Sequence, residues 1–472
     1  MKLSKAPKIL ISRGDVLGDV VVTTALIKPI KKAYPDSQIY FLVKKVYHPI
    51  LADIPEITGL IEDPFPYQWS AKSIPDLFKL AKKIRSKKFD VFIGLWEVSR
   101  YGLLALLAGI PIRIGHRFSL SNSLLYSHKV ALNYQDFMVH KMTYNLSLLG
   151  PLGIQNIHEP RIYLAQTRSV NNALKSRYPQ LNQQYTVVHV GAGNPQRVLL
   201  AHQFRQLLHF LKLQNIPVVL LGLSKDEPLV SSILDDQSLE SSDLNLVGQL
   251  SLEETKHVIA NANLVFSSDS APVHIAAGYQ VPVIIYYLNR IQNACHWGAW
   301  GTGQQIIKSR HDCIDQCQPS VCRKLDCKDP FDIQLSFPYI KAIYEGKTPL
   351  PNLKEQQYHW AQTSITIGQL GTVSASLLSY FDQHGWSWVS LPEKQTISQL
   401  SRWIEINNIN VIVMGTQWRS LWARFKVFVA RYIASNRITF LPKLTHCESA
   451  FEWEAQVAHW LRNETISMDL EE

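Results

Sequence analysis

The sequence predicts an α/β protein with two doubly wound parallel domains and a smaller third α/β domain. Three observations support this fold class. A chain of 472 residues has room for about three domains. Strands followed by glycine-containing loops and helices recur from residues 8 and 186, and strand–helix alternation resumes after residue 364. The apolar content of 46% and charged content of 18% indicate globular domains with sizeable cores.

The first βαβ unit begins close to the N-terminus. An apolar strand is expected over Lys8–Ser12, then a glycine loop, a helix over Val20–Ala33 and a strand over Gln38–Val43. The loop has neither dinucleotide-binding nor P-loop spacing. Asp19 stands on the first turn of the helix, at the carboxyl edge of the sheet. There it either stabilises the helix dipole or takes part in chemistry.

The alternation continues through the first 160 residues. A helix is expected over Pro75–Lys87, a strand over Asp90–Leu95, a helix over Arg100–Leu107 and a further strand at Arg113–Gly115. The segment Lys82–Lys88 carries five basic residues. Such a run is usually a solvated helix face, although it could also meet an acidic acceptor.

The second domain repeats the pattern. Its strands are expected over Thr186–Val190, Val218–Leu221, Leu244–Val247, Ala262–Phe266 and Val281–Tyr286, and its helices over His202–Lys212 and Leu252–Ala260. Two glycines, Gly191 and Gly193, follow the first of these strands. Two doubly wound domains in tandem imply a cleft between them, and ligands of such sheets collect at the carboxyl edge.

The stretch Ser267–Ala277 is the centre of this second domain. A strand runs into Ser268, Asp269 and Ser270, and Pro272 stands near a helix start. Free N–H groups and the positive dipole end at such a start form an anion site suited to a phosphate. For the turn taken alone, an ordinary capped helix with His274 packed on its first turn is the more common arrangement.

The last 110 residues form a separate pattern. Strands are expected over Ser364–Ile367, Trp388–Leu391, Asn410–Met414 and Ile438–Leu441, with helices after each, which favours a small flavodoxin-like domain. Its third helix, Trp418–Ala434, has an aromatic face that includes Trp422 and Phe425 and is flanked by cations. That face either meets a membrane interface or packs on the small sheet.

The net charge of the chain indicates which kinds of binding partner it favours. A net charge of +10 favours anionic ones, which include nucleic acid, nucleotide phosphates and an anionic membrane. No apolar run approaches the roughly 20 residues that a membrane span requires, and Met1–Pro7 leads into no signal-peptide core, so a cytoplasmic protein is expected.

Four of the cysteines are close together in the sequence. Cys313, Cys317, Cys322 and Cys327 are spaced C-x3-C-x4-C-x4-C, which suits either a structural zinc site or unliganded thiols.

Several motifs then point to a known family. They are the Leu-Gly-Asp within Leu10–Thr24, the segments Phe89–Gly115, His140–Gly153 and Val188–Arg197, and Gly248–Ala277 with its Ser-Leu-Glu-Glu and Asp-Ser-Ala-Pro-Val-His. In this order they resemble the ADP-heptose:lipopolysaccharide heptosyltransferases, glycosyltransferase family 9. The resemblance covers residues 8–345. It implies a GT-B fold with two Rossmann-like domains, in which residues 1–163 hold the acceptor and residues 164–350 hold the nucleotide sugar. Residues 360–472 are an appended domain of unknown role.

The resemblance also implies roles for individual residues. It makes Asp19 the catalytic base, and it assigns donor binding to the residues Gly191, Gly193, Arg197, Leu250, Asp269, Ser270 and His274. It assigns acceptor binding to Arg13 and Gly18. The chain departs from the family pattern at Ala271, where glycine is usual, at Val198–Leu200 after Arg197, and at Gly94, where aspartate is frequent.

The implied activity is inverting transfer of heptose or a related sugar from a nucleoside-diphosphate sugar, ADP-heptose, to a lipopolysaccharide core or similar glycolipid. No D-x-D-like pair calls for a catalytic metal. We expect no cofactor apart from the optional zinc, and no nucleic-acid partner. Attachment to the cytoplasmic face of the inner membrane is a further option. The alternative function is a catalytically silent sugar-nucleotide-binding protein with an interaction module at its C-terminus.

Overall fold

The computed structural model describes residues 4–66, 73–96, 98–116, 124–130, 140–155, 157, 160–235, 238–288, 294–308, 328 and 331–347, and the strands within 366–370, 387–391, 411–414 and 439–440. The chain divides into two compact units. The first comprises Met1–Leu132, Lys141–His311 and Cys322–Pro351, and the second comprises the remaining residues, including Asn352–Glu472. Among the described residues, no helix is both long enough and apolar enough to span a membrane.

The first unit contains two six-stranded sheets whose pairs are all parallel. In the first sheet the order is β3-β2-β1-β4-β5-β6. Its strands are β1 (Lys8–Ser12), β2 (Gln38–Val43), β3 (Ile57–Glu62), β4 (Val91–Gly94), β5 (Ile112–His116) and β6 (His128–Val130). This is the Rossmann order, and the chain direction across the sheet reverses between β1 and β4, where ligands of such sheets bind.

The helices of this half confirm the predicted alternation with one correction. The single helix expected over Val20–Ala33 begins at Leu17 and is divided into α1 (Leu17–Thr23), a 3₁₀ turn and α2 (Ile27–Ala33). Pro29 explains the break. It lacks an N–H, and inside a continuous helix its ring would clash with the carbonyl four residues earlier, so it is tolerated only in the first turn of a new helix. The other helices are α3 (His48–Leu51), α4 (Ile74–Ser86), α5 (Ser99–Leu107) and α7 (Lys141–Ser147).

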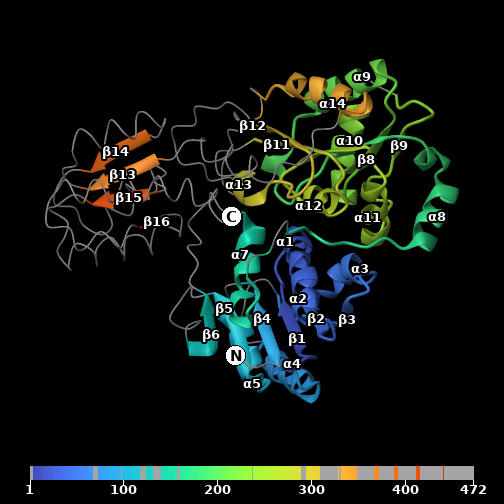
Figure 1. The fold of residues 1–472 in the computed structure, drawn as a ribbon. Coiled ribbons are helices and arrows are strands. Elements are labelled where there is room, and N and C mark those ends of the chain that lie inside the picture. The colour runs from blue at the N-terminus through green and yellow to red at the C-terminus, as the bar shows by residue number, and fades with distance from the viewer. Residues whose placement is uncertain are drawn as a thin grey trace. The chain divides into compact units, whose positions relative to one another are not determined.

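The second sheet has the order β12-β11-β10-β7-β8-β9, which repeats the topology of the first. Its strands are β7 (Thr186–His189), β8 (Val218–Leu221), β9 (Leu244–Asn245), β10 (Leu264–Ser268), β11 (Val283–Tyr287) and β12 (Gln304–Lys308). The helices are α8 (Arg168–Arg177), α9 (Ala201–Leu213), α10 (Glu227–Leu234), α11 (Leu252–Ala260), α12 (Ala271–Gly278), α13 (Ala294–Trp297) and α14 (Phe337–Tyr344). The two predicted doubly wound sheets are therefore confirmed, as Figure 1 shows. The boundary between the domains near residue 163 stays a prediction.

The second unit contains a parallel sheet of order β14-β13-β15-β16. Its strands are β13 (Thr366–Leu370), β14 (Ser387–Leu391), β15 (Val411–Met414) and β16 (Thr439–Phe440), close to the predicted ranges. The helices expected between them, including Trp418–Ala434, lie outside the described residues. The four strands are confirmed, and the flavodoxin-like domain stays a prediction.

Candidate functional site

The starts of α1 and α12 pack against each other, one from each six-stranded half (Figure 1). Gly18 lies at the contact: a Cβ atom there would be 3.0 Å from His274 Cδ2 and 3.8 Å from Ala271 Cα. The residue therefore has to be small. Since Asp19 follows Gly18 and α12 follows Asp269, the two stretches that the sequence singles out meet in one place.

Ala271, which stands where the family usually has glycine, is compatible with this packing. Ala271 is the first residue of α12, and its backbone is not among the left-handed positions, so the glycine usual in the family is not needed for conformation. Gly94 fits as well, because a Cβ atom there would be 2.3 Å from the Tyr126 hydroxyl oxygen. An aspartate at residue 94 has no room in this chain.

We expect Gly18→Val to disturb this contact. The added methyl groups would push α1 away from the ring of His274, and such overpacking typically destabilises a protein by about 1 to 3 kcal/mol. Urea unfolding and turnover should both be affected, since the contact also positions the candidate site. Gly150→Ala is the control, because a Cβ at Gly150 meets nothing within 4 Å. Equal stability of the two variants would show that the α1–α12 contact is not close-packed.

A buried arginine fixes the carboxylate of Asp19. The Arg13 side chain, at the end of β1, is 3% exposed, and its Nη2 forms an ion pair with Asp19 Oδ1. Its Nη1 donates to the Leu95 carbonyl at 2.7 Å, so the guanidinium is also anchored at the end of β4. Asp19 itself is 6% exposed. The predicted acceptor-binding role of Arg13 stays a prediction, and the contacts add a positioning role.

Asp15 is a member of this cluster that the sequence analysis missed. Its carboxylate receives Arg13 Nε at 2.7 Å and Arg13 Nη2 at 2.6 Å. The Tyr47 hydroxyl donates to the Asp15 carbonyl at 3.3 Å. Burial, and secondarily the charge of Asp15, raise the pKa of Tyr47 above its ordinary value. An acid two residues after an arginine in the loop was the available signal. Two carboxylates thus share one guanidinium at the carboxyl edge of the first sheet.

The second loop brings Arg197 beside Asp269. The Asn194 side chain accepts from Gln196 N at 3.0 Å and starts the 3₁₀ turn Pro195–Arg197. Arg197 Nη1 then lies 3.4 Å from both the carbonyl and Oδ2 of Asp269, and the arginine side chain is 39% exposed. Contacts this long in a partly exposed side chain leave the guanidinium able to meet an anion.

The helix start at α12 differs in detail from the expected turn. Strand β10 extends through Ser267 and Ser268, which are fully buried, and Ser268 Oγ donates to the Gly191 carbonyl at 3.4 Å. Ser270 is the N-cap, and its hydroxyl donates to the Ser268 carbonyl at 3.2 Å without capping the helix. The helix start therefore offers its backbone dipole, while Ser268 joins two loops.

The glycine loop after β7 is crossed by residues from the loop after β8. A Cβ on Gly191 would lie 2.1 Å from Asp226 Oδ2, so only glycine fits. Lys225 Nζ donates to the Ala192 carbonyl at 2.8 Å, which adds a cation that the sequence analysis did not find. A Cβ on Gly193 would meet nothing within 4 Å, so that side of the loop is open.

Leu250 is half-buried and precedes the helix cap of α11. It follows β9, so it belongs to the same carboxyl edge, and its donor-binding role stays a prediction. The four cysteines of residues 313–327 lie outside the described residues. Within the described ranges, no group of three or more His, Cys, Asp or Glu side chains could hold a metal.

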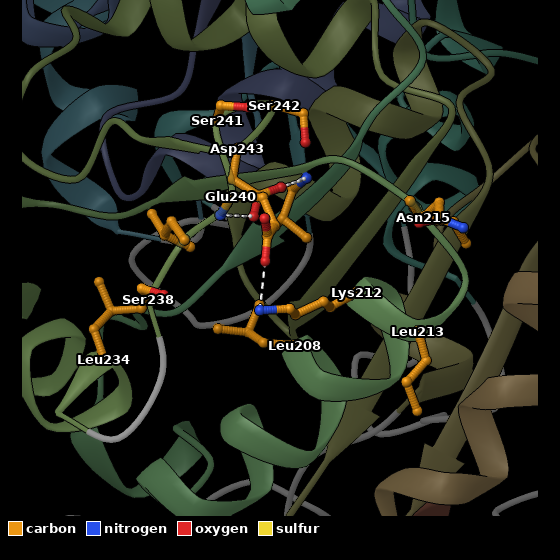
Figure 2. A pocket seen from close by; sticks show the side chains of 13 residues that line it. Leu208, Lys212, Leu213, Asn215, Leu234, Ser238, Glu240, Ser241, Ser242 and Asp243 are labelled. Carbon is orange, nitrogen blue, oxygen red and sulfur yellow. Dashed lines mark hydrogen bonds and ion pairs between the residues drawn. The ribbon is translucent and has the colours of Figure 1, made fainter.

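A cavity of about 520 Å³ lies elsewhere on the second half. It is lined by residues from α9, α10 and the segment before β9, and Figure 2 shows Lys212 and Glu240 paired across it. Val218, which begins β8, also lines it. Because the cavity is at the amino ends of the strands, it is separate from the candidate site at their carboxyl ends.

Comparison with known proteins decides the family. The model of "Glycosyltransferase family 9 (heptosyltransferase)" matches residues 77–326, which is 250 of 472 residues and more than half of the chain. The chain belongs to this family. It is thus a glycosyltransferase, and the resemblance found in the sequence is confirmed. The matched range begins after Asp19, so the role of Asp19 stays a prediction.

Individual heptosyltransferases are also similar to this chain in sequence. The chain is 26% identical over 279 residues to lipopolysaccharide heptosyltransferase 3 of Escherichia coli, which covers 57% of this chain and 79% of that protein. It is 26% identical over 296 residues to lipooligosaccharide heptosyltransferase 2 of Haemophilus influenzae, with 59% and 82% covered.

Two solved structures share the fold. E. coli ADP-heptose lps heptosyltransferase II aligns with a TM-score of 0.59 at 19% identity, covering 72% of this chain and 99% of that one. E. coli heptosyltransferase WaaC with ADP aligns with a TM-score of 0.55 at 16% identity, covering 71% and 99%. At these identities the alignments concern the fold, which is that of the family's enzymes.

Proposed function

We propose that this glycosyltransferase moves heptose, or a related sugar, from ADP-heptose to a lipopolysaccharide core or similar glycolipid, with inversion at the anomeric carbon. The names of the relatives support the sugar and the acceptor class. The observation that carries the proposal for this chain is the packing of α1 on α12. It brings a fixed carboxylate from one half to an anion-binding helix start in the other.

The acceptor hydroxyl is a poor nucleophile at neutral pH and needs a base in the transition state. Arg13 holds Oδ1 of Asp19, and no described residue donates a hydrogen bond to Oδ2. In our proposal Asp19 Oδ2 takes the hydroxyl proton while the acceptor oxygen forms its bond to the anomeric carbon. The bond from that carbon to the diphosphate oxygen breaks, and the diphosphate leaves with the electron pair. One displacement inverts the centre.

The departing diphosphate gains negative charge as its bond to the sugar breaks. In the proposed complex Arg197 and the positive dipole end of α12 stabilise that charge, with Asp269, Ser270 and His274 shaping the site. The guanidinium of Arg197 supplies a permanent positive charge and a planar fork suited to phosphate. No step of this mechanism requires a metal, and a zinc at the four cysteines would be structural.

A panel of nucleotides tests the donor class. At 100 times its dissociation constant, a ligand that binds only the folded state stabilises it by about 2.7 kcal/mol. We expect ADP-heptose and ADP to raise the melting temperature, and UDP- and GDP-sugars to do so less.

Arg197→Ala should remove most of this shift, because the diphosphate carries charge in the ground state too. Arg177→Ala is the matched control, since the Arg177 side chain is also partly exposed, at 48%, and paired with one acid, Glu254. A shift of equal size in both variants would contradict the donor site, and preference for UDP-sugars would contradict the donor.

A further inference from the structure

Helix α4 presents an unusual outer face. Its inner side, formed by Leu77, Leu80, Ala81 and Ile84, is buried in the core of the first half, and α4 lies beside α5 on the first sheet (Figure 1). The outer side combines exposed apolar residues with cations. An amphipathic helix on a sheet normally has charged and polar residues on its outer face. The mixture on α4 therefore makes this face a candidate interaction surface.

Among the described residues, cations outnumber acids on and beside this helix. Six basic residues lie in or directly after the helix, against one acid in its first turn, Asp76. The six are Lys79, Lys82, Lys83, Arg85, Lys87 and Lys88. None forms an ion pair with any residue that the structure describes. Other surface lysines do pair, as Lys28 does with Glu56 and Lys347 with Glu345. The face therefore carries a concentrated positive charge suited to an external anion.

The apolar residues indicate what kind of anion. Ile74 is 44% exposed and Phe78 is 57% exposed. They stand one helical turn apart, and Lys82 continues the same side. Large apolar side chains next to lysines match the boundary between lipid headgroups and acyl chains. A nucleic-acid backbone would use the cations and leave Phe78 and Ile74 in water.

We propose that the outer face of α4 docks on an anionic lipid bilayer. Cations contact the headgroups, and Ile74 and Phe78 insert below them. Because α4 joins β3 to β4 in a parallel sheet, its first turn lies at the carboxyl edge, the edge that also holds Asp19. Docking would bring that edge close to lipid-borne molecules. The proposal holds whichever sugar the enzyme transfers, so its failure is separate from failure of the proposed function.

Sedimentation of the full chain with lipid vesicles tests the proposal. The protein should bind phosphatidylcholine vesicles that contain phosphatidylglycerol and should dissociate from them as the salt concentration rises. It should not bind vesicles of pure phosphatidylcholine. The triple variant Lys79→Gln, Lys82→Gln, Lys83→Gln should bind on the order of 100-fold more weakly at low salt, from the usual contribution of each cation near an anionic surface. Some vesicle binding should remain at higher salt, because salt does not screen the apolar contacts. Ile74→Ser with Phe78→Ser should weaken this remaining binding.

Two further variants make the test specific. Arg168→Gln with Lys175→Gln and Arg177→Gln removes three cations from α8 and should leave binding unchanged. Trp418→Ser with Trp422→Ser and Phe425→Ser changes the other segment for which a membrane contact was considered, and it should leave the α4-dependent binding unchanged. The proposal is overturned if the wild type binds no anionic vesicles or if the α4 variants bind like the wild type. It is also overturned if those variants lose only binding to duplex DNA.

Discussion

Asp19→Asn should lower the turnover rate by about 10²- to 10⁴-fold and leave donor affinity nearly unchanged, because a positioned general base contributes about that factor. Asparagine keeps the size and polarity of the side chain but cannot accept the acceptor's proton. The carboxylate has only one oxygen engaged by Arg13, so the loss should fall on the chemical step. Steady-state kinetics with saturating donor, together with the donor-induced melting shift, separate turnover from binding.

Asp76→Asn is the matched control for this prediction. Asp76 is also an aspartate in the first turn of a helix, but it is exposed on α4 and is not one of the candidate site residues. It should transfer sugar at the wild-type rate. If Asp19→Asn also transferred sugar at the wild-type rate, Asp19 would not be the base. The role that the family resemblance implies for this residue would then be wrong.

The second large effect concerns a buried ion pair between the two six-stranded halves. The Lys256 side chain, on α11, is fully buried, and its Nζ lies 2.7 Å from Asp53 Oδ2 and 3.1 Å from the Pro49 carbonyl. The side chain of Asp53 is 21% exposed. The two partners are therefore unequal: water can replace the lysine beside Asp53, but little can replace the carboxylate beside Lys256.

Asp53→Ala should consequently destabilise the protein by about 3 kcal/mol, because it leaves a buried ammonium without a counter-charge. Lys256→Met should cost less, since the buried charge goes with it, and Asp53→Ala with Lys256→Met should recover part of the loss. Urea unfolding of the four proteins measures this. Lys347→Met is the control, since Lys347 pairs with Glu345 at 2.8 Å but is exposed. An Asp53→Ala variant as stable as the wild type would show that this pair does not hold the two halves together.

The same pair sets a pH dependence. Burial alone would raise the pKa of Asp53, but hydrogen bonds from Lys256 and Thr167 and the charges of Lys256 and His257 together lower it below its ordinary value of 3.8. The pairing thus stabilises the fold above that ordinary value. Its contribution is lost as the pH falls through the lowered pKa.

Much of the fold could be predicted from local pattern. Strands β1, β2 and β8 and helix α11 have the predicted bounds, because each is a clear apolar run or a capped amphipathic segment. Three strands were missed. β3 contains Gly59 and an irregular register, β12 has two apolar residues in five, and β6 has three residues in all. All three are edge strands, whose position depends on pairing with a neighbour in the sheet and whose own sequence pattern is weak.

The site could be predicted only in pieces. Position at the carboxyl edges of strands pointed to Asp19, Arg197 and Asp269 separately. That α1 packs on α12 through Gly18 is a tertiary contact, and no local pattern encodes it. Lys225 was missed for the same reason, since it becomes part of the site through a partner brought close by the fold. Asp15 was missed although its partner, Arg13, is only two residues away in the same loop.

Transfer of heptose by this chain can be tested with purified components. A direct test incubates the purified full chain with ADP-heptose and a heptose-deficient lipopolysaccharide acceptor. Mass spectrometry follows both products, and NMR of the heptosylated acceptor gives the anomeric configuration. We predict heptosylated acceptor and ADP in equal amounts, with the anomeric configuration inverted and both products nearly abolished by Asp19→Asn. ADP-heptose that binds but yields no heptosylated acceptor would contradict the account and favour a sugar-nucleotide-binding protein.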